Sequence, residues 1–173
     1  MNEIHGRKIA VLAEELYEDL ELWYPTIRLR EAGAAVVLLG TGQEKYTGKH
    51  GLPVKVDGPV ESMSASDLDA LVIPGGYAPD RLRRSAGVVK LVRDMDRAGK
   101  LIAFICHAGW VPASAGILRN RRITSFFSIR DDMENAGAKW EDNPVVVDGN
   151  LITSRYPDDL PEFCHAIISY LAE

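Results

Sequence analysis

Short apolar runs divide the chain up to residue 105 and predict its central strands. They cover residues 7–13, 34–40, 69–74 and 101–105, with glycine, proline or polar residues between them. Apolar runs without polar alternation are typical of strands that are buried on both faces of a parallel sheet. We therefore expect these four segments to form the centre of the fold.

Helical spacing of apolar residues predicts the elements between the strands. Such residues recur from Leu20 to Leu29, and a glycine at position 33 ends the pattern. Two apolar runs joined by Asp148 and Gly149 predict a tight hairpin over residues 145–153. The alternation of strands and helices predicts a three-layer α/β sandwich with a mostly parallel sheet, and residues 1–173 form one domain without a linker. Further helices are predicted over residues 85–98, 110–118, 125–137 and 158–173, and a short strand over residues 53–57.

Composition and charge exclude several classes of protein. The 173 residues carry a formal net charge of −5, which argues against a nucleic-acid-binding surface. No apolar run approaches the ~18 residues of a membrane helix, and the N-terminus lacks the apolar stretch of a signal peptide. Two cysteines without a C-x-x-C or H-E-x-x-H motif argue against a disulfide scaffold and a metal site. We expect a cytoplasmic protein with neither nucleic acid nor membrane as a partner.

Cys106 directly follows the apolar run 101–105, and a predicted helix begins at Trp110. A cysteine on such a turn lies at the carboxyl edge of a parallel sheet, where α/β folds bind their ligands. The free N–H groups of a helix N-terminus favour a thiolate, so the turn predicts a nucleophile elbow with a lowered thiol pKa. The alternative is an inert buried cysteine, which is our interpretation of Cys164 in the C-terminal helix.

The loop after the first strand argues against nucleotide binding. Residues 14–19 contain four carboxylates and no glycine, whereas phosphate-binding loops need glycine N–H groups. After the second strand, Lys45 occupies the third glycine position of the fragment that begins at Gly40. A receiver domain needs an aspartate at the end of its central strand, where this chain has Pro74 and two glycines. We set both classes aside.

Three strand ends instead carry Glu18, the pair Gly75–Gly76 and Cys106. Paired glycines allow close backbone approach, so their N–H groups can point at a developing oxyanion. A carboxyl group near the thiol can act as acid or base if burial keeps it protonated. Taken alone, Glu18 can equally be a solvated loop acid, and the glycine pair can be a simple turn.

Several motifs together resemble the DJ-1/PfpI superfamily, and in particular its PfpI-like branch. Residues 18–25 resemble the family's helix start, residues 47–57 and 74–81 resemble two of its loops, and residues 105–107 resemble its elbow. The resemblance continues through residues 129–137, 146–150 and 154–160. It implies a flavodoxin-like fold, related to class I glutamine amidotransferases, and an enzyme without a cofactor.

The resemblance also implies a role for each candidate residue. Cys106 is implied as the nucleophile, His107 as its neighbour and Glu18 as the carboxyl group that contacts the thiol. Asp80 of a neighbouring subunit is implied to pair with the histidine, so that the site forms only in a homo-oligomer, a dimer or a hexamer. The implied oxyanion and substrate-binding set comprises Gly75, Gly76, His107, Ala108 and Trp110.

The segment after the cysteine departs from the family pattern. The usual Cys-His-Gly-Pro is replaced here by Cys-His followed by Ala108, Gly109 and Trp110, which brings a large aromatic side chain near the pocket. Asp80 is one methylene shorter than the glutamate common at that position. These departures bear on the substrate and on the reach of Asp80 to His107.

Three functions fit these residues. A cofactor-free enzyme would add Cys106 to the aldehyde of methylglyoxal or glyoxal, and Glu18 or His107 would move protons until a 2-hydroxy acid is released. Deglycation of early sugar adducts would use the same thiol. A peptidase or amidase would use Cys106 and His107 for acyl transfer, with Asp80 orienting the imidazole. A redox-sensing or chaperone-like stress protein would oxidise Cys106. We favour the carbonyl enzyme, acting in stress protection.

Overall fold

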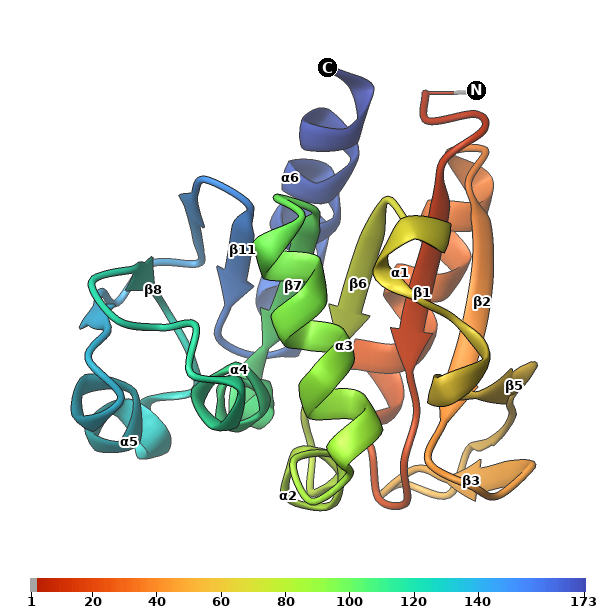
Figure 1. The fold of residues 1–173 in the computed structure, drawn as a ribbon, viewed down its shortest axis with the longest axis horizontal. Coiled ribbons are helices and arrows are strands. Elements are labelled where there is room, and N and C mark those ends of the chain that lie inside the picture. Colours follow the sequence, from red (N-terminus) through yellow and green to blue (C-terminus); the bar gives the residue numbers. More distant parts are fainter. Residues whose placement is uncertain (1–2) are drawn as a thin grey trace.

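The computed structural model describes residues 3–173, which contain a central sheet of seven strands (Figure 1). The strand order is β10-β11-β7-β6-β1-β2-β5, and within this sheet only the β10 edge strand is antiparallel to its neighbour. The sheet is thus mostly parallel, as the apolar runs predict. Its strands are β1 (Lys8–Leu12), β2 (Ala35–Gly40), β5 (Gly58–Pro59), β6 (Ala70–Ile73), β7 (Leu101–Ile105), β10 (Val145–Asp148) and β11 (Leu151–Ser154).

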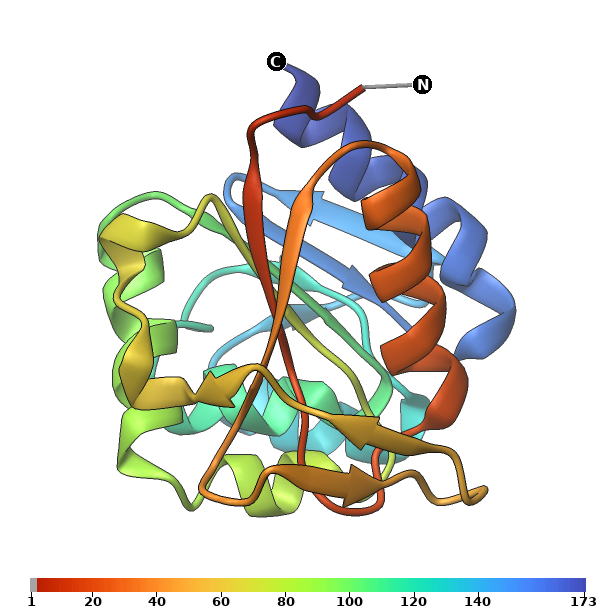
Figure 2. The same ribbon diagram turned by 90° about the vertical axis from the view of Figure 1, so that its right-hand side faces the viewer.

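Helices cover both faces of the sheet. Helices α1 (Asp19–Glu31) and α6 (Leu160–Ala172) contact each other on one face, on the right in Figure 2. Helix α3 (Ala86–Arg97) lies on the opposite face and contacts α4 (Trp110–Ala115), which in turn contacts the short α2 (Ala78–Leu82). The three-layer, flavodoxin-like α/β sandwich expected from the sequence is therefore confirmed.

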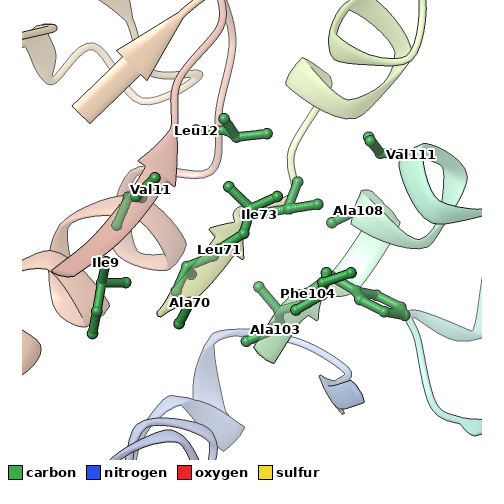
Figure 3. Packing of buried hydrophobic residues seen from close by; sticks show 14 of the residues in the cluster. Ile9, Val11, Leu12, Ala70, Leu71, Ile73, Ala103, Phe104, Ala108 and Val111 are labelled. Carbon is green, nitrogen blue, oxygen red and sulfur yellow. The ribbon is translucent and has the colours of Figure 1, made fainter. Parts of the chain in front are cut away.

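The core lies along the three central strands. Every residue of β6 and β7 is buried, and β1 is buried from Ile9 onward. Side chains from these strands, including Val11, Ile73 and Phe104, pack together in Figure 3. Burial of these strands on both faces explains why their sequences show apolar runs and no alternation.

The peripheral elements differ most from the sequence prediction. Helix α4 ends at Ala115, before the predicted residue 118, because Gly116 adopts a left-handed conformation with φ of 73°. The predicted helix over residues 125–137 is reduced to a 3-10 turn and α5 (Arg130–Asn135). The predicted strand over residues 53–57 is shorter, and the patterns missed its partner and a second two-stranded sheet. These elements are β3 (Lys45–Thr47) with β4 (Pro53–Lys55), and β8 (Arg122–Ile123) with β9 (Lys139–Trp140).

The carboxyl ends of β1, β6 and β7 meet at one edge of the sheet, the lower edge in Figure 1. β6 lies between β1 and β7, so the loops that follow these strands are neighbours. An isolated bridge between Tyr17 and Gly76 joins the first two loops. This edge brings together the segments that contain Glu18, Gly75 and Cys106.

No helix within residues 3–173 has both the length and the apolar character needed to cross a bilayer.

Candidate active site

Cys106 occupies a strained turn between β7 and α4. Its φ is 62°, a left-handed value that costs a residue with a side chain ~1–3 kcal/mol. The main-chain N–H groups of His107 and Gly76 lie near its sulfur and lower the pKa of its thiol, and its carbonyl accepts the N–H of Phe126 at 3.1 Å. These contacts fix the thiol at the sheet edge, in the manner of a nucleophile elbow.

Glu21 is the carboxyl group that contacts the thiol. Its side chain, from the first turn of α1, is fully buried, and Oε2 accepts the Gly75 N–H at 2.7 Å. Burial raises the pKa of the Glu21 carboxyl to about 8, and the Gly75 N–H opposes this shift only in part. Oε1 is buried without a fixed hydrogen-bond partner among residues 3–173. A proton on Glu21 can therefore be donated toward the sulfur.

Glu18 has a different position from the one predicted. It lies one helical turn before Glu21 and is also buried, but its Oε2 pairs with Lys49 Nζ at 2.6 Å and lies 3.6 Å from His50 Nε2. The prediction that Glu18 contacts the thiol is wrong, and Glu21 makes that contact. The signal was present in the sequence, because Glu21 recurs at helical spacing with the buried residues Pro25 and Leu29.

The thiol and the Glu21 carboxyl titrate as a pair. Burial and then the charge of Glu21 raise the pKa of the Cys106 thiol, whereas the N–H groups of His107 and Gly76 lower it. The lowered thiol pKa expected from the helix N-terminus stays a prediction, which burial and the adjacent carboxylate oppose and the N–H groups favour. Loss of one proton from the pair opposes loss of the second. Burial also raises the pKa of Cys164, which lies in the packed helix α6.

His107 contacts the thiol directly. Its Nδ1 lies 3.2 Å from Cys106 Sγ, and its Nε2 lies 3.1 Å from the Ser128 hydroxyl. Burial, followed by the charge of Lys49, lowers the pKa of His107, which keeps the imidazole neutral near pH 7. A neutral Nδ1 can accept the thiol proton.

Aromatic side chains hold the imidazole in place. The ring of Phe126 stacks on His107 with 5.0 Å between the ring centroids, and the ring of Trp110 packs edge-on against it with 5.3 Å between the centroids. Trp110 is itself fixed by a 2.8 Å hydrogen bond from its Nε1 to Asp132. Sequence reasoning missed Phe126 and Ser128, because both fall in the predicted helix over residues 125–137, whereas the structure places them in and beside a 3-10 turn before α5.

Asp80 makes no hydrogen bond or ion pair with His107 within residues 3–173. It lies on α2 with a half-exposed side chain and pairs with Arg84. Within residues 3–173 the Nε2 atom of the imidazole lies against the Ser128 hydroxyl. A role for Asp80 thus depends on a second subunit and stays a prediction.

The main-chain N–H groups of Gly75 and Gly76 point at different partners. The Gly75 N–H is donated to Glu21, so it does not point at an oxyanion as predicted, whereas the Gly76 N–H points at the sulfur. A Cβ at Gly75 would lie 2.4 Å from Glu21 Oε2 and 2.7 Å from Cys106 Cβ, so only glycine allows this approach. Ala108 is also misplaced by the sequence prediction, because it packs in the core and does not line the pocket (Figure 3).

A pocket of about 220 Å³ opens above the thiol. Such a volume holds a small molecule of a few heavy atoms, since a water molecule takes up ~30 Å³. Its walls are mainly apolar and aromatic, and Lys49 and Glu18 supply charge at one side. Residues 3–173 contain no cluster of three or more His, Cys, Asp or Glu side chains arranged to hold a metal ion. The aromatic wall residues are Tyr77, Trp110, Phe126 and Tyr156.

Comparison with known proteins places this geometry in a family. The model of the DJ-1/PfpI family matches residues 7–170. The chain is 44% identical over 164 residues to the protein named deglycase PfpI from Pyrococcus furiosus, covering 95% of this chain and 99% of that protein. It is 43% identical over 160 residues to the protein named putative cysteine protease YraA from Bacillus subtilis, covering 91% and 94% of the two chains.

Solved structures agree with this assignment. A two-domain protein from Anabaena variabilis, with DJ-1/ThiJ/PfpI-like and ferritin-like domains, matches 96% of this chain with a TM-score of 0.94 and 46% identity. This chain spans 48% of that longer protein. DJ-1beta from Drosophila melanogaster matches 96% of this chain and 90% of its own, with a TM-score of 0.90 and 32% identity. The chain belongs to the DJ-1/PfpI family.

Proposed function

We propose that this protein is a cysteine-dependent, cofactor-free enzyme that acts on reactive carbonyls, by converting methylglyoxal or glyoxal to a 2-hydroxy acid or by removing early glycation adducts. The observation that carries the proposal is the thiol of Cys106, held between His107 Nδ1 and the buried carboxyl of Glu21 in a small pocket. The names of the relatives from Pyrococcus furiosus and of a protein/nucleic acid deglycase from Escherichia coli, 39% identical over 161 residues, support it.

The chemistry begins with addition of the thiol to the aldehyde. Sγ forms a bond to the carbonyl carbon, and the thiol proton passes through His107 to the carbonyl oxygen, which gives a hemithioacetal. The N–H groups of Gly76 and His107 are available to the developing oxyanion. Glu21 or His107 then removes the proton from the thiol-bearing carbon and returns a proton to the adjacent carbonyl carbon, while the hydroxyl proton of the hemithioacetal passes to the adjacent carbonyl oxygen, which gives a 2-hydroxy thioester. Water cleaves the thioester, releases the 2-hydroxy acid and restores the thiol.

The alternative function is a peptidase or amidase. The 3.2 Å contact between Cys106 and His107 is also suited to acyl transfer, and one relative is named a putative cysteine protease. The pocket volume favours a small carbonyl compound, because a peptide would have to lie across the pocket mouth.

The test is incubation with methylglyoxal in the absence of glutathione, followed by measurement of lactate. We expect lactate from the wild type and from Cys164→Ala, and none above background from Cys106→Ala. A fluorogenic peptide series run in parallel tests the alternative. Peptide cleavage without lactate formation, or lactate formation by Cys106→Ala, would overturn the proposal.

We also propose that the active unit is a homo-oligomer in which Asp80 of one subunit reaches His107 of another. Asp80 is half exposed, and Tyr77 beside it has an exposed fraction of 66%. In a closed symmetric assembly each subunit both gives and receives this carboxylate. Mixing inactive Cys106→Ala with Asp80→Ala subunits should restore activity that neither variant has alone. A fully active monomer would contradict this arrangement. The cytoplasmic location and the single-domain organisation of residues 1–173 also stay predictions.

A further inference from the structure

Lys49 carries the ammonium group that lines the thiol pocket, and the chemistry proposed above assigns no role to it. It lies in the loop between β3 and β4 and lines the same pocket as Cys106. Its side chain is 34% exposed, whereas that of its partner Glu18 is 7% exposed. Both members of the pair line the pocket, and Lys49 is the more accessible of the two.

The loop that carries Lys49 is rigidly held. The Lys49 N–H donates to the Tyr17 carbonyl at 2.9 Å. The buried carboxylate of Asp19 accepts the N–H groups of His50 and Leu52, each at 2.9 Å. A Cβ at Gly48 would lie 2.5 Å from the Asp19 carboxylate, so glycine lets the loop close onto it. These contacts fix the backbone from which the ammonium reaches the pocket.

The charges around the pocket leave the ammonium in the outermost position. The buried carboxylate of Glu18 forms an ion pair with Lys49, and its hydrogen bond raises the pKa of Lys49, which keeps the ammonium charged. His107 is neutral, and Glu21 is mainly protonated near pH 7. An incoming anion therefore meets the Lys49–Glu18 ion pair at the pocket wall, in which the ammonium is more exposed than the carboxylate, and Glu21 beside the thiol is mainly uncharged.

We propose that Lys49 determines specificity by binding a carboxylate of the substrate, so that the preferred substrate is a small vicinal dicarbonyl compound that also carries a carboxylate and whose aldehyde carbon faces Cys106. This inference rests on the proposed carbonyl chemistry and names its substrate class. The Nζ of Lys49 has donors beyond the one directed at Glu18, and these can bind a second carboxylate. A neutral dicarbonyl of similar size would lack this interaction.

Two alkylating reagents of similar size test the proposal without turnover. Iodoacetate carries a carboxylate, iodoacetamide carries a neutral amide, and both react with the same thiolate. The rate at which each reagent alkylates Cys106 is followed by peptide mass spectrometry. The ratio of the iodoacetate rate to the iodoacetamide rate is then divided by the same ratio for N-acetylcysteine. The fraction of thiolate cancels from this normalised ratio. We expect a normalised ratio above one for the wild type. Lys49→Met should lower it about fivefold, the factor for a partly exposed ion pair of ~1 kcal/mol.

Two matched variants control the experiment. Lys49→Arg should keep a raised ratio, because a cation remains at the pocket wall. Lys45→Met removes an exposed lysine from nearby β3 and should leave the ratio unchanged. A wild-type ratio of one, an equal effect of both methionine variants, or an equal slowing of both reagents by Lys49→Met would each overturn the inference. Failure of the proposed function gives a different result, namely no carbonyl turnover while the alkylation ratio stays raised.

Discussion

Replacing Glu21 with glutamine tests the coupling between the buried carboxyl and the thiol. The amide keeps the size of the side chain and an oxygen to accept the Gly75 N–H, but it cannot ionise. Two unit charges ~4 Å apart at an effective dielectric constant of ~20 repel by ~4 kcal/mol. Because one pKa unit corresponds to 1.36 kcal/mol, the second proton of the wild-type pair should leave about three pH units above the first.

The assay is the rate of iodoacetamide alkylation at Cys106 as a function of pH. For the wild type we expect a first rise near pH 8, where Glu21 titrates, and a second rise at higher pH. Glu21→Gln should show a single rise, with its midpoint at least one pH unit below the second wild-type step. Glu18→Gln is the matched control and should keep two steps, because Glu18 pairs with Lys49. A single wild-type step that Glu21→Gln leaves unchanged would refute the reasoning.

Three further predictions concern stability and close packing. The folded pKa of Glu21 lies above its ordinary value of 4.5, so its contribution to stability is complete below pH 4.5 and is lost as pH rises to about 8. Urea unfolding should show a loss of up to ~5 kcal/mol over this window, and Glu21→Gln should remove most of it. Gly75→Ala should lower stability by ~1–3 kcal/mol and slow alkylation of Cys106, because its methyl group would collide with Cys106 and Glu21. Gly58→Ala, which meets only a flexible serine side chain, is its control in thermal unfolding. Asp19→Ala should lower the free energy of unfolding in urea by ~2–4 kcal/mol, because it leaves two loop N–H groups unpaired. It should also lower the preference of Cys106 for iodoacetate over iodoacetamide. An unchanged preference would mean that Asp19 does not position Lys49.

The sequence predicts the centre of this fold well because burial on both faces imposes continuous apolar runs. It predicts the thiol for a related reason, since a cysteine directly after such a run must lie at the carboxyl edge of the sheet. The acid was misassigned because two glutamates, Glu18 and Glu21, lie one helical turn apart, and only the packing of α1 decides which faces the sulfur. Ser128 and Phe126 were missed, because their approach to His107 depends on the path of the segment before α5, which the sequence pattern predicts as continuous helix.

The position of the site at three adjacent strand ends has a consequence for how its residues act. The thiol follows β7, the Gly75 N–H follows β6 and the Glu21 carboxyl follows β1, and the Glu21 carboxyl interacts with both of the other groups. Strain in the Cys106 backbone is sustained because all three strands are buried and cannot shift independently. A change in any one loop therefore alters both the position of the thiol and the proton that it shares. The effects of Gly75→Ala and Glu21→Gln on alkylation should not add, and a double-mutant cycle should give a coupling energy of ~0.5–3 kcal/mol. Additive effects would mean that Gly75 acts on the thiol only through space, without the carboxyl as intermediary.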